Sequence, residues 1–221
     1  MTAPGHEVEA RRAYDAVAEP YTAWAGPDIS AATEAAVDRA LLGALVDLLV
    51  GGPAGPVADL GCGPGRVAAL MAGHGLTALG LDLSPGMVAQ AGEAHPGLPV
   101  LAGSLRALPF ADGALAGAVC WYSIIHTPPE GLAAVAAELA RVLRPDAHLL
   151  VAFQAGDGGR RHRAEAFGRP ISLDSFRHEP DLVAEVLAGA GLLVHTRVVR
   201  DPGLDHESSP QAFLLARRGS W

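Results

Sequence analysis

The chain has 221 residues, of which 50% are hydrophobic, and its mean hydropathy is +0.25. This length suffices for one domain with a full three-layer core, and because no apolar run approaches the length of a membrane span, we expect a globular protein with no membrane partner. The formal net charge of -8 disfavours nucleic acid as a partner, since a row of phosphates requires a basic surface.

Individual residue types exclude further chemistry. All 16 basic residues are arginine, so neither a lysine Schiff base nor a P-loop lysine is available. The two cysteines, Cys62 and Cys120, are far apart and have no C-x-x-C partner, so we expect packing residues and no metal site. Residues 1–12 lack the apolar stretch of a secretory signal, so we expect a cytoplasmic location.

The first 50 residues precede the predicted sheet and form a helical lid or cap segment. Aromatic residues gather between Tyr14 and Trp24, either as a lid over a ligand or as the docking face of a terminal helix. Pro20 and the pair Gly26-Pro27 are expected to break this segment. From Ile29 to Val50 apolar residues recur every three or four positions, which predicts a long amphipathic helix.

The core is expected to span residues 51–221 and to be organised around the stretch 57–66, VADLGCGPGR. An apolar strand carrying Asp59 is followed by Gly61, Gly63 and Gly65, directly ahead of an apolar helical pattern. Such a turn lets backbone N–H groups approach a ligand at the positive end of a helix. The third glycine comes two residues after the second, whereas the dinucleotide fingerprint G-x-G-x-x-G requires three.

A second acidic residue ends the next strand. Residues 77–81 form a short apolar run that ends in Asp82, about twenty residues after the glycine turn. A carboxylate at this place can accept hydrogen bonds from both hydroxyls of a ribose. Ser84 then reads as a helix N-cap, with Pro85 as the first helical residue.

Strands and helices continue to alternate, which is typical of a parallel sheet covered on both faces. Between residues 154 and 180 the periodicity fails, and this insertion either lines the substrate site or is a solvated loop. The remaining predicted elements are helices at 66–73, 85–94, 131–143 and 181–190 and strands at 100–102, 116–121, 147–153, 192–199 and 211–217.

The end of the fourth strand carries the cluster Trp121-Tyr122-Ser123-Ile124-Ile125-His126. Ligands of open α/β sheets bind beyond the carboxyl ends of the strands, so this cluster should face the same crevice as Asp59 and Asp82. The following residues, Thr127 to Glu130, fit a capping box that opens the helix at 131–143.

The sequence resembles the class I S-adenosylmethionine (SAM)-dependent methyltransferases, of the small-molecule type found in ubiquinone and menaquinone biosynthesis. Their first motif, D-x-G-x-G-x-G, matches Asp59, Gly61, Gly63 and Gly65. The run from Gly103 to Gly113, with its L-P-F, is similar to the third motif of the family, and the opening around Tyr14 is similar to its Y-D-x-x-A-x-x-Y.

The resemblance implies a Rossmann-like, doubly wound α/β fold, whose mostly parallel seven-stranded sheet has an antiparallel last strand. It implies SAM as cofactor, with S-adenosylhomocysteine as product. Asp59 and the glycines would hold the methionine part, Asp82 the ribose and Leu83 the adenine face, and the family's acid near the adenine amino group is replaced by a serine. The cofactor-binding set is Asp59, Gly61, Gly63, Gly65, Asp82, Leu83, Ser104, Leu105 and Trp121.

Catalytic candidates are the groups near the crevice that can move a proton. His126 leads because it follows the fourth strand, and Tyr122 and Tyr14 come next. Three further histidines, His162, His178 and His206, are weaker candidates.

The function expected from these features is methyl transfer to an O or N atom of a small metabolite by in-line displacement. A cyclase or isomerase that binds SAM, or a non-catalytic SAM-binding protein, are alternatives on the same fold. An NAD oxidoreductase is a weaker alternative, opposed by the glycine spacing. The oligomeric state is left open between monomer and homodimer.

Overall fold

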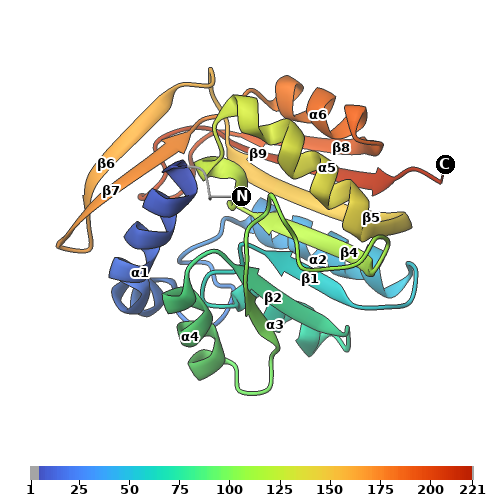
Figure 1. Cartoon of the computed structure of the whole chain (residues 1–221), viewed down its shortest axis with the longest axis horizontal. Coiled ribbons are helices and arrows are strands. Elements are labelled where there is room, and N and C mark those ends of the chain that lie inside the picture. The colour runs from blue at the N-terminus through green and yellow to red at the C-terminus, as the bar shows by residue number, and fades with distance from the viewer. Residues whose placement is uncertain (1–4, 221) are drawn as a thin grey trace.

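The computed structural model describes residues 5–220, so the first four residues of the expected lid and of the stretch searched for a leader lie outside it, as does Trp221. Within residues 5–220, seven strands form one sheet in the order β3-β2-β1-β4-β5-β9-β8 (Figure 1). The strands are β1 (Val57–Leu60), β2 (Ala78–Asp82), β3 (Val100–Ala102), β4 (Leu115–Trp121), β5 (Leu143–Gln154), β8 (Leu192–Arg200) and β9 (Gln211–Arg218).

Strand direction places the site. β1 pairs in parallel with β2 on one side and with β4 on the other, so the chain order reverses between β1 and β4. In open α/β sheets this reversal opens a crevice beyond the carboxyl ends of the strands. β9 lies antiparallel between β5 and β8. The predicted doubly wound sheet with an antiparallel last strand is therefore confirmed.

Helices cover both faces of the sheet, and its central strands are therefore buried on both sides. Every residue of β4 is buried, as expected for an interior parallel strand. One core cluster lies under α5 (Leu132–Val142) and α6 (Pro180–Gly189), which cross in front of the sheet in Figure 1. The other lies under α2 (Ala36–Val50) and α3 (Arg66–Gly73). Among residues 5–220, no helix combines the length and apolar character needed to cross a bilayer.

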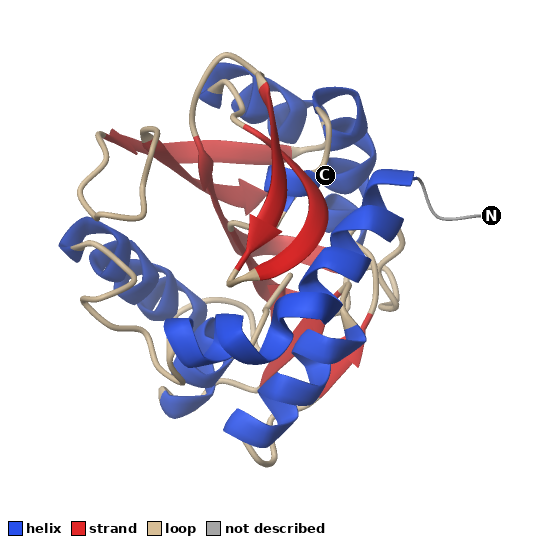
Figure 2. Ribbon diagram, turned by 90° about the vertical axis from the view of Figure 1, so that its left-hand side faces the viewer, coloured by secondary structure: helices blue, strands red, loops and turns tan. Residues whose placement is uncertain are grey.

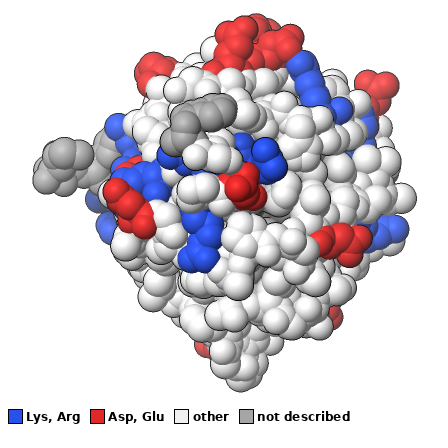
Figure 3. Space-filling view, turned by 90° about the vertical axis from the view of Figure 1, so that its right-hand side faces the viewer, with Lys and Arg blue, Asp and Glu red and all other residues white. Residues whose placement is uncertain are grey.

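Two segments that are distant in sequence lie side by side at the carboxyl edge of the sheet. They are α1 (Gly5–Ala25) and the antiparallel hairpin of β6 (Arg160–Ala166) and β7 (Arg169–Phe176) (Figures 1 and 2). α1 also packs on α4 (Pro85–Ala94). Figure 3 shows the opposite end of the molecule, where positively charged arginine and negatively charged acidic side chains are interspersed.

The insertion at 154–180 is thus a hairpin, and the prediction of an irregular segment is wrong. Every residue of β6 from Arg160 to Glu165 is exposed. With no face in the core, the strand shows no alternation of apolar and polar residues, and alternation is the usual sign of a half-buried strand.

Pro20 lies inside α1 and does not break it. A proline within a helix leaves the carbonyl four residues earlier without its usual N–H partner. That carbonyl belongs to Ala16, and it accepts a hydrogen bond of 2.6 Å from Nη1 of Arg169 on the hairpin. The hairpin thus supplies the missing donor, which the local sequence could not reveal.

The second helix starts at Ala36, not at Ile29. Polar side chains in the intervening turns bind nearby backbone groups: Ser30 N–H donates to the Glu34 carboxylate, and Ala32 N–H to the Ser30 hydroxyl. Such local bonds compete with a helix. Asp38 accepts from the N–H of Ala35 and thereby marks the true start.

The predicted capping box at Thr127–Glu130 is also wrong. Two short 3-10 turns, η1 (Ile124–His126) and η2 (Pro129–Gly131), occupy this region, and no side chain caps them or α5. A residue before proline is driven out of the helical region. Thr127 and Pro128 each precede a proline and are extended, so α5 begins only at Leu132.

Candidate functional site

The glycine turn after β1 has the backbone that only glycine adopts easily. Gly61, Gly63 and Gly65 have φ values of 85°, 53° and 84°, where other residues are strained. A Cβ added to Gly61 would lie 2.2 Å from Cβ of Ser123, a member of the cluster at the end of β4. The turn and the end of β4 therefore approach so closely that no side chain fits between them.

Asp59 holds this turn from behind. Its side chain is buried, and Oδ2 accepts the N–H of Ala68 in the first turn of α3 at 3.1 Å. Burial raises the pKa of Asp59 to about 7, against the lowering by that hydrogen bond. Oδ1 has no partner within the described residues. Asp59 and Gly65 lie outside the residues that line the cavity, so both stay proposals as cofactor-binding residues.

Asp82 joins the two motifs. Its Oδ2 accepts the N–H of Gly63 at 2.8 Å, and Oδ1 accepts the N–H of Ser84 at 2.8 Å. Burial raises the pKa of Asp82, although these backbone donors favour the ionised form. Each carboxylate oxygen retains a second acceptor position. Ser84 caps α4 through a bond from the N–H of Met87, as predicted.

Helix α1 is anchored beside this pair. Oδ1 of Asp15 accepts the Ser84 hydroxyl at 2.6 Å and the N–H of Gly86 at 2.9 Å. A Cβ at Gly86 would come within 3.2 Å of Ala18 and of Asp15, so α1 packs directly on the start of α4. No role for Asp15 could be predicted from local sequence patterns, because its partners are about 70 positions away.

The serine that replaces the family's acid has a carboxylate beside it. Ser104 donates to Oε1 of Glu7, on α1, at 2.7 Å, and accepts the N–H of Arg106. Both Glu7 and Ser104 line the cavity, next to Leu83 and Leu105. Helix α1 thus brings the carboxylate of Glu7 to the loop that lacks an acid, and sequence reasoning missed this residue.

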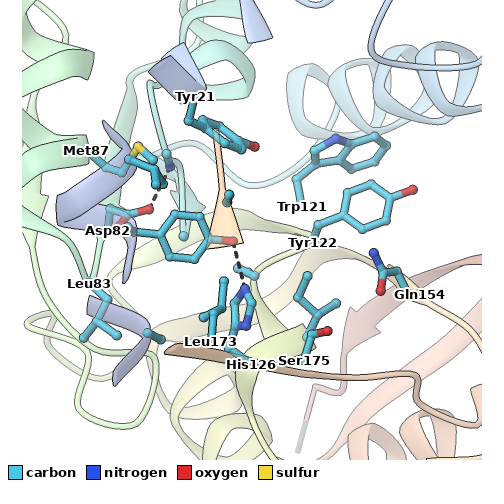
Figure 4. A pocket seen from close by; sticks show the side chains of 18 of the residues that line it. Tyr21, Asp82, Leu83, Met87, Trp121, Tyr122, His126, Gln154, Leu173 and Ser175 are labelled. Carbon is cyan, nitrogen blue, oxygen red and sulfur yellow. Dashed lines mark hydrogen bonds between the residues drawn. The ribbon is translucent and has the colours of Figure 1, made fainter. Parts of the chain in front are cut away.

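His126 and Tyr14 meet across the crevice. Nδ1 of His126 lies 2.6 Å from the backbone carbonyl of Asp174 on β7, which can only accept, so Nδ1 carries the proton. In the neutral ring Nε2 is then the acceptor, and it takes the Tyr14 hydroxyl at 2.8 Å, the dashed line ending on His126 in Figure 4. Burial lowers the pKa of His126 and raises that of Tyr14.

A single cavity of about 670 Å³ joins these parts. In Figure 4, Asp82, Leu83 and Met87 lie on one side of it, and Trp121, Tyr122 and Gln154 on the other. The predicted site residues that line it are Tyr14, Gly61, Gly63, Asp82, Leu83, Ser104, Leu105, Trp121, Tyr122 and His126.

Tyr122 has a strained backbone, with φ of 58°. Its ring packs edge-to-face on Trp121 and Phe213, with centroids 5.5 and 6.4 Å away. Within the described residues, Trp121 Nε1 and Ser123 Oγ are buried without a partner. Such atoms call for a bound polar group, because leaving them unpaired costs about 1–3 kcal/mol each.

Of the weaker histidine candidates, His162 and His206 line the cavity, whereas His178 does not. His178 is fully buried beside the carbonyl of Ile124 and does not line the cavity. His162 contacts the Asp174 carboxylate at 2.9 Å. His206 lies edge-to-face on Trp24, with ring centroids 5.3 Å apart.

The fold and the cradle at the strand reversal define a Rossmann-like α/β protein of the nucleotide-cofactor type. Residues 57–146 match the family model described as a methyltransferase domain. These residues therefore form a class I SAM-dependent methyltransferase domain, which confirms the recognition from sequence.

Relatives agree with this assignment. The demethylmenaquinone methyltransferase of Beutenbergia cavernae is 34% identical over 116 residues, covering 52% of this chain and 48% of the relative. The chain thus spans about half the length of that curated relative.

Solved structures share the fold along the whole chain. Magnesium protoporphyrin IX methyltransferase from Synechocystis PCC 6803, with bound SAH, has a TM-score of 0.69 at 18% identity, covering 97% of this chain and 100% of the other. The [4+2]-cyclase SpnF has a TM-score of 0.72 at 16% identity, covering 100% and 99%.

Proposed function

We propose that the protein is an enzyme that transfers a methyl group from SAM to an O or N atom of a small metabolite. The observation that carries this proposal is that one cavity contains both the glycine cradle with Asp82 and the His126–Tyr14 pair. A cofactor held at the glycine turn and an acceptor held near His126 would then meet inside the same cavity.

The residues present fit SAM. The N–H groups of Gly61 and Gly63 already donate to Leu81 and Asp82, so the carbonyls of these glycines would bind the methionine part. Asp82 would bind the ribose hydroxyls, and Leu83, Leu105 and Glu7 would surround the adenine. The unpaired Trp121 Nε1 supplies a further donor at the cavity wall. When bound, SAM supplies a methyl group activated by its sulfonium. The protein's own task is to orient the acceptor, exclude water and take up a proton.

The geometry offers a route for that proton. A hydroxyl or amine placed against Tyr14 can give its proton to the Tyr14 oxygen while Tyr14 passes its own proton to Nε2 of His126. His126 would then carry a proton on both nitrogens, with Nδ1–H still bonded to the Asp174 carbonyl. Because burial lowers the pKa of His126, the ring is neutral and ready to accept at neutral pH.

A labelled-methyl assay tests the proposal. The protein is incubated with methyl-labelled SAM and a set of small phenols, carboxylates and amines, and both S-adenosylhomocysteine and labelled product are measured. We expect at least one acceptor to be methylated, and the rate to fall at least 100-fold in the His126→Gln variant.

The alternative function, a SAM-binding cyclase, predicts a different result in this assay. SpnF shares the fold, and its likeness to this chain is one of fold alone at 16% identity. SAM that binds without being consumed, across the whole acceptor set, would count against methyl transfer and direct attention to a cyclase or a non-catalytic SAM-binding protein.

A further inference from the structure

The two faces of the β6–β7 hairpin differ in how their cations are paired. Arg160 and His162 alternate along β6 on the outer face, and both contact the Asp174 carboxylate, at 2.7 and 2.9 Å. Of these two, His162 also reaches the lining of the cavity. Arg161 and Arg163 lie on the other face, because side chains alternate along a strand. Their cross-strand partners are Ser175 and Leu173, which line the cavity and flank His126 in Figure 4.

The acids of the cavity are already engaged. Glu34 pairs with Arg66 at 2.8 Å, and Glu207 pairs with Arg200. Glu7 and Asp82 accept the hydrogen bonds described above. Of the four arginines that line the cavity, Arg66 is therefore the one with a carboxylate partner among the described residues.

The other three lining arginines retain unused donors. Within residues 5–220, Arg161, Arg163 and Arg177 form no ion pair with a carboxylate. Arg161 has one long contact, 3.4 Å, to its neighbour's carbonyl. Arg177 donates to the Ser208 hydroxyl at 2.9 Å, and its buried Nε has no partner.

Arg163 lies near the proposed reaction centre. Burial is the main cause of the shifted pKa values of His126 and Tyr14, and the charge of Arg163 acts on both groups as well. An acceptor bound by this guanidinium would be held beside the His126–Tyr14 pair.

We propose that the acceptor carries a negatively charged oxygen group, a carboxylate or a phosphate, and that Arg161 and Arg163 bind it. The proposal rests on the proposed function, since it names the substrate class of the same site. Guanidinium groups match these oxygens with paired N–H donors. Among the described residues, two of the four acids that line the cavity are ion-paired and the two hairpin arginines that line it are not, so the hairpin side of the cavity attracts an anion and disfavours a cationic acceptor.

Matched probes test this on the protein saturated with S-adenosylhomocysteine. Benzoate, phenyl phosphate and neutral benzamide share an aromatic ring, which suits a cavity also lined by Tyr21, Trp24 and Phe167. Calorimetry at pH 7.5 should show at least one of the two anions binding at least tenfold more tightly than benzamide. Whichever anion binds more tightly identifies the source of the charge.

Variants assign the effect to the hairpin face. The double variant Arg161→Gln/Arg163→Gln should lose at least tenfold in affinity for the anion and retain its affinity for S-adenosylhomocysteine, which shows that it is folded. Arg160→Gln, a neighbour on the outer face of the same strand, is the control and should bind the anion as the parent does.

Each contrary outcome has a distinct meaning. Equal or absent binding of the anions and benzamide, in protein that binds S-adenosylhomocysteine, overturns the anionic acceptor. Equal losses in the double variant and in Arg160→Gln overturn the assignment to Arg161 and Arg163. Failure to bind S-adenosylhomocysteine in folded protein instead contradicts the proposed function.

Discussion

The two halves of the cavity are built in different ways. The cofactor half is a continuous strand-turn-helix closed by the hydrogen bond from Gly63 to Asp82, 19 positions apart. The acceptor half is assembled from three distant segments: Tyr14 and His126 are 112 positions apart, and His126 and Asp174 are 48 apart. The first half is a motif of backbone geometry, whereas the second depends on how α1 and the hairpin dock.

The largest expected effect strikes the cofactor half. Gly61→Ala would force a Cβ against Ser123 at a positive φ, and we expect roughly 3 kcal/mol or more of destabilisation together with loss of S-adenosylhomocysteine binding. Urea unfolding and calorimetry measure both.

Gly43→Ala is the matched control for that substitution. Gly43 lies within α2 with open space around it, so alanine there should stabilise the protein by about 0.5–1 kcal/mol. If Gly61→Ala behaved like this control, the glycine cradle would lose its physical basis.

The next effect isolates the acceptor half. His126→Gln should reduce methyl transfer by about 10²–10⁴-fold, as expected for loss of a general base, and leave the affinity for S-adenosylhomocysteine within about twofold. Tyr14→Phe should have a smaller effect in the same direction. A loss of cofactor affinity that matched the loss of rate would mean that His126 acts by holding the structure together.

The pH dependence of the rate gives a sharper test of the same group. Because burial lowers the pKa of His126 below its ordinary 6.5, the ring should still be neutral at pH 6.5 and gain a proton only at a lower pH. The value of kcat/KM should therefore stay level through pH 6.5 and fall only as the pH drops through the lowered pKa. A fall centred above pH 6.5 contradicts this assignment.

The next prediction concerns Asp59, the buried acid behind the glycine turn, and its effect on the pH dependence of stability. Its pKa of about 7 lies above the unfolded value of about 3.9. Between these values the folded chain therefore binds more protons, and this group's contribution to stability is lost as the pH rises toward 7. Asp59→Asn should remove this pH-dependent loss, which amounts to on the order of 2 kcal/mol in the free energy of unfolding. Urea unfolding of the cofactor-free protein at pH 5 and pH 8 should show the variant gaining on the parent at the higher pH.

The smallest expected effect lies at the adenine end of the cofactor half, where α1 contributes Glu7. Glu7→Gln keeps the shape of the side chain but removes the charge that accepts the Ser104 hydroxyl at 2.7 Å. We expect a loss of about 1 kcal/mol in S-adenosylhomocysteine binding, measured by calorimetry. Glu9→Gln, an exposed site on the same helix, should bind as the parent does.

The contrast between the halves also explains what the sequence could predict. Asp59, the three glycines, Asp82 and the Ser84 cap are local patterns, and the fold followed from them together with the alternation of strands and helices. The end of β4 placed His126 correctly for the same reason.

The remainder depends on contacts that no local pattern encodes. Arg169 satisfies the carbonyl that Pro20 leaves free, so a helix continues where its sequence predicts a break. Glu7 supplies a carboxylate to Ser104. Asp174 fixes the tautomer of His126 through its backbone carbonyl, which any residue at this position would provide. Which arginines of β6 face the cavity is decided only by the pairing of β6 with β7.

One measurement tests the central claim most directly: calorimetric titration of the protein with S-adenosylhomocysteine, alongside Asp82→Ala and the exposed control Asp47→Ala. We predict saturable binding that Asp82→Ala weakens at least tenfold and Asp47→Ala leaves unchanged. Absence of binding in folded protein, or equal binding by all three proteins, would contradict the placement of the cofactor at the glycine turn and Asp82.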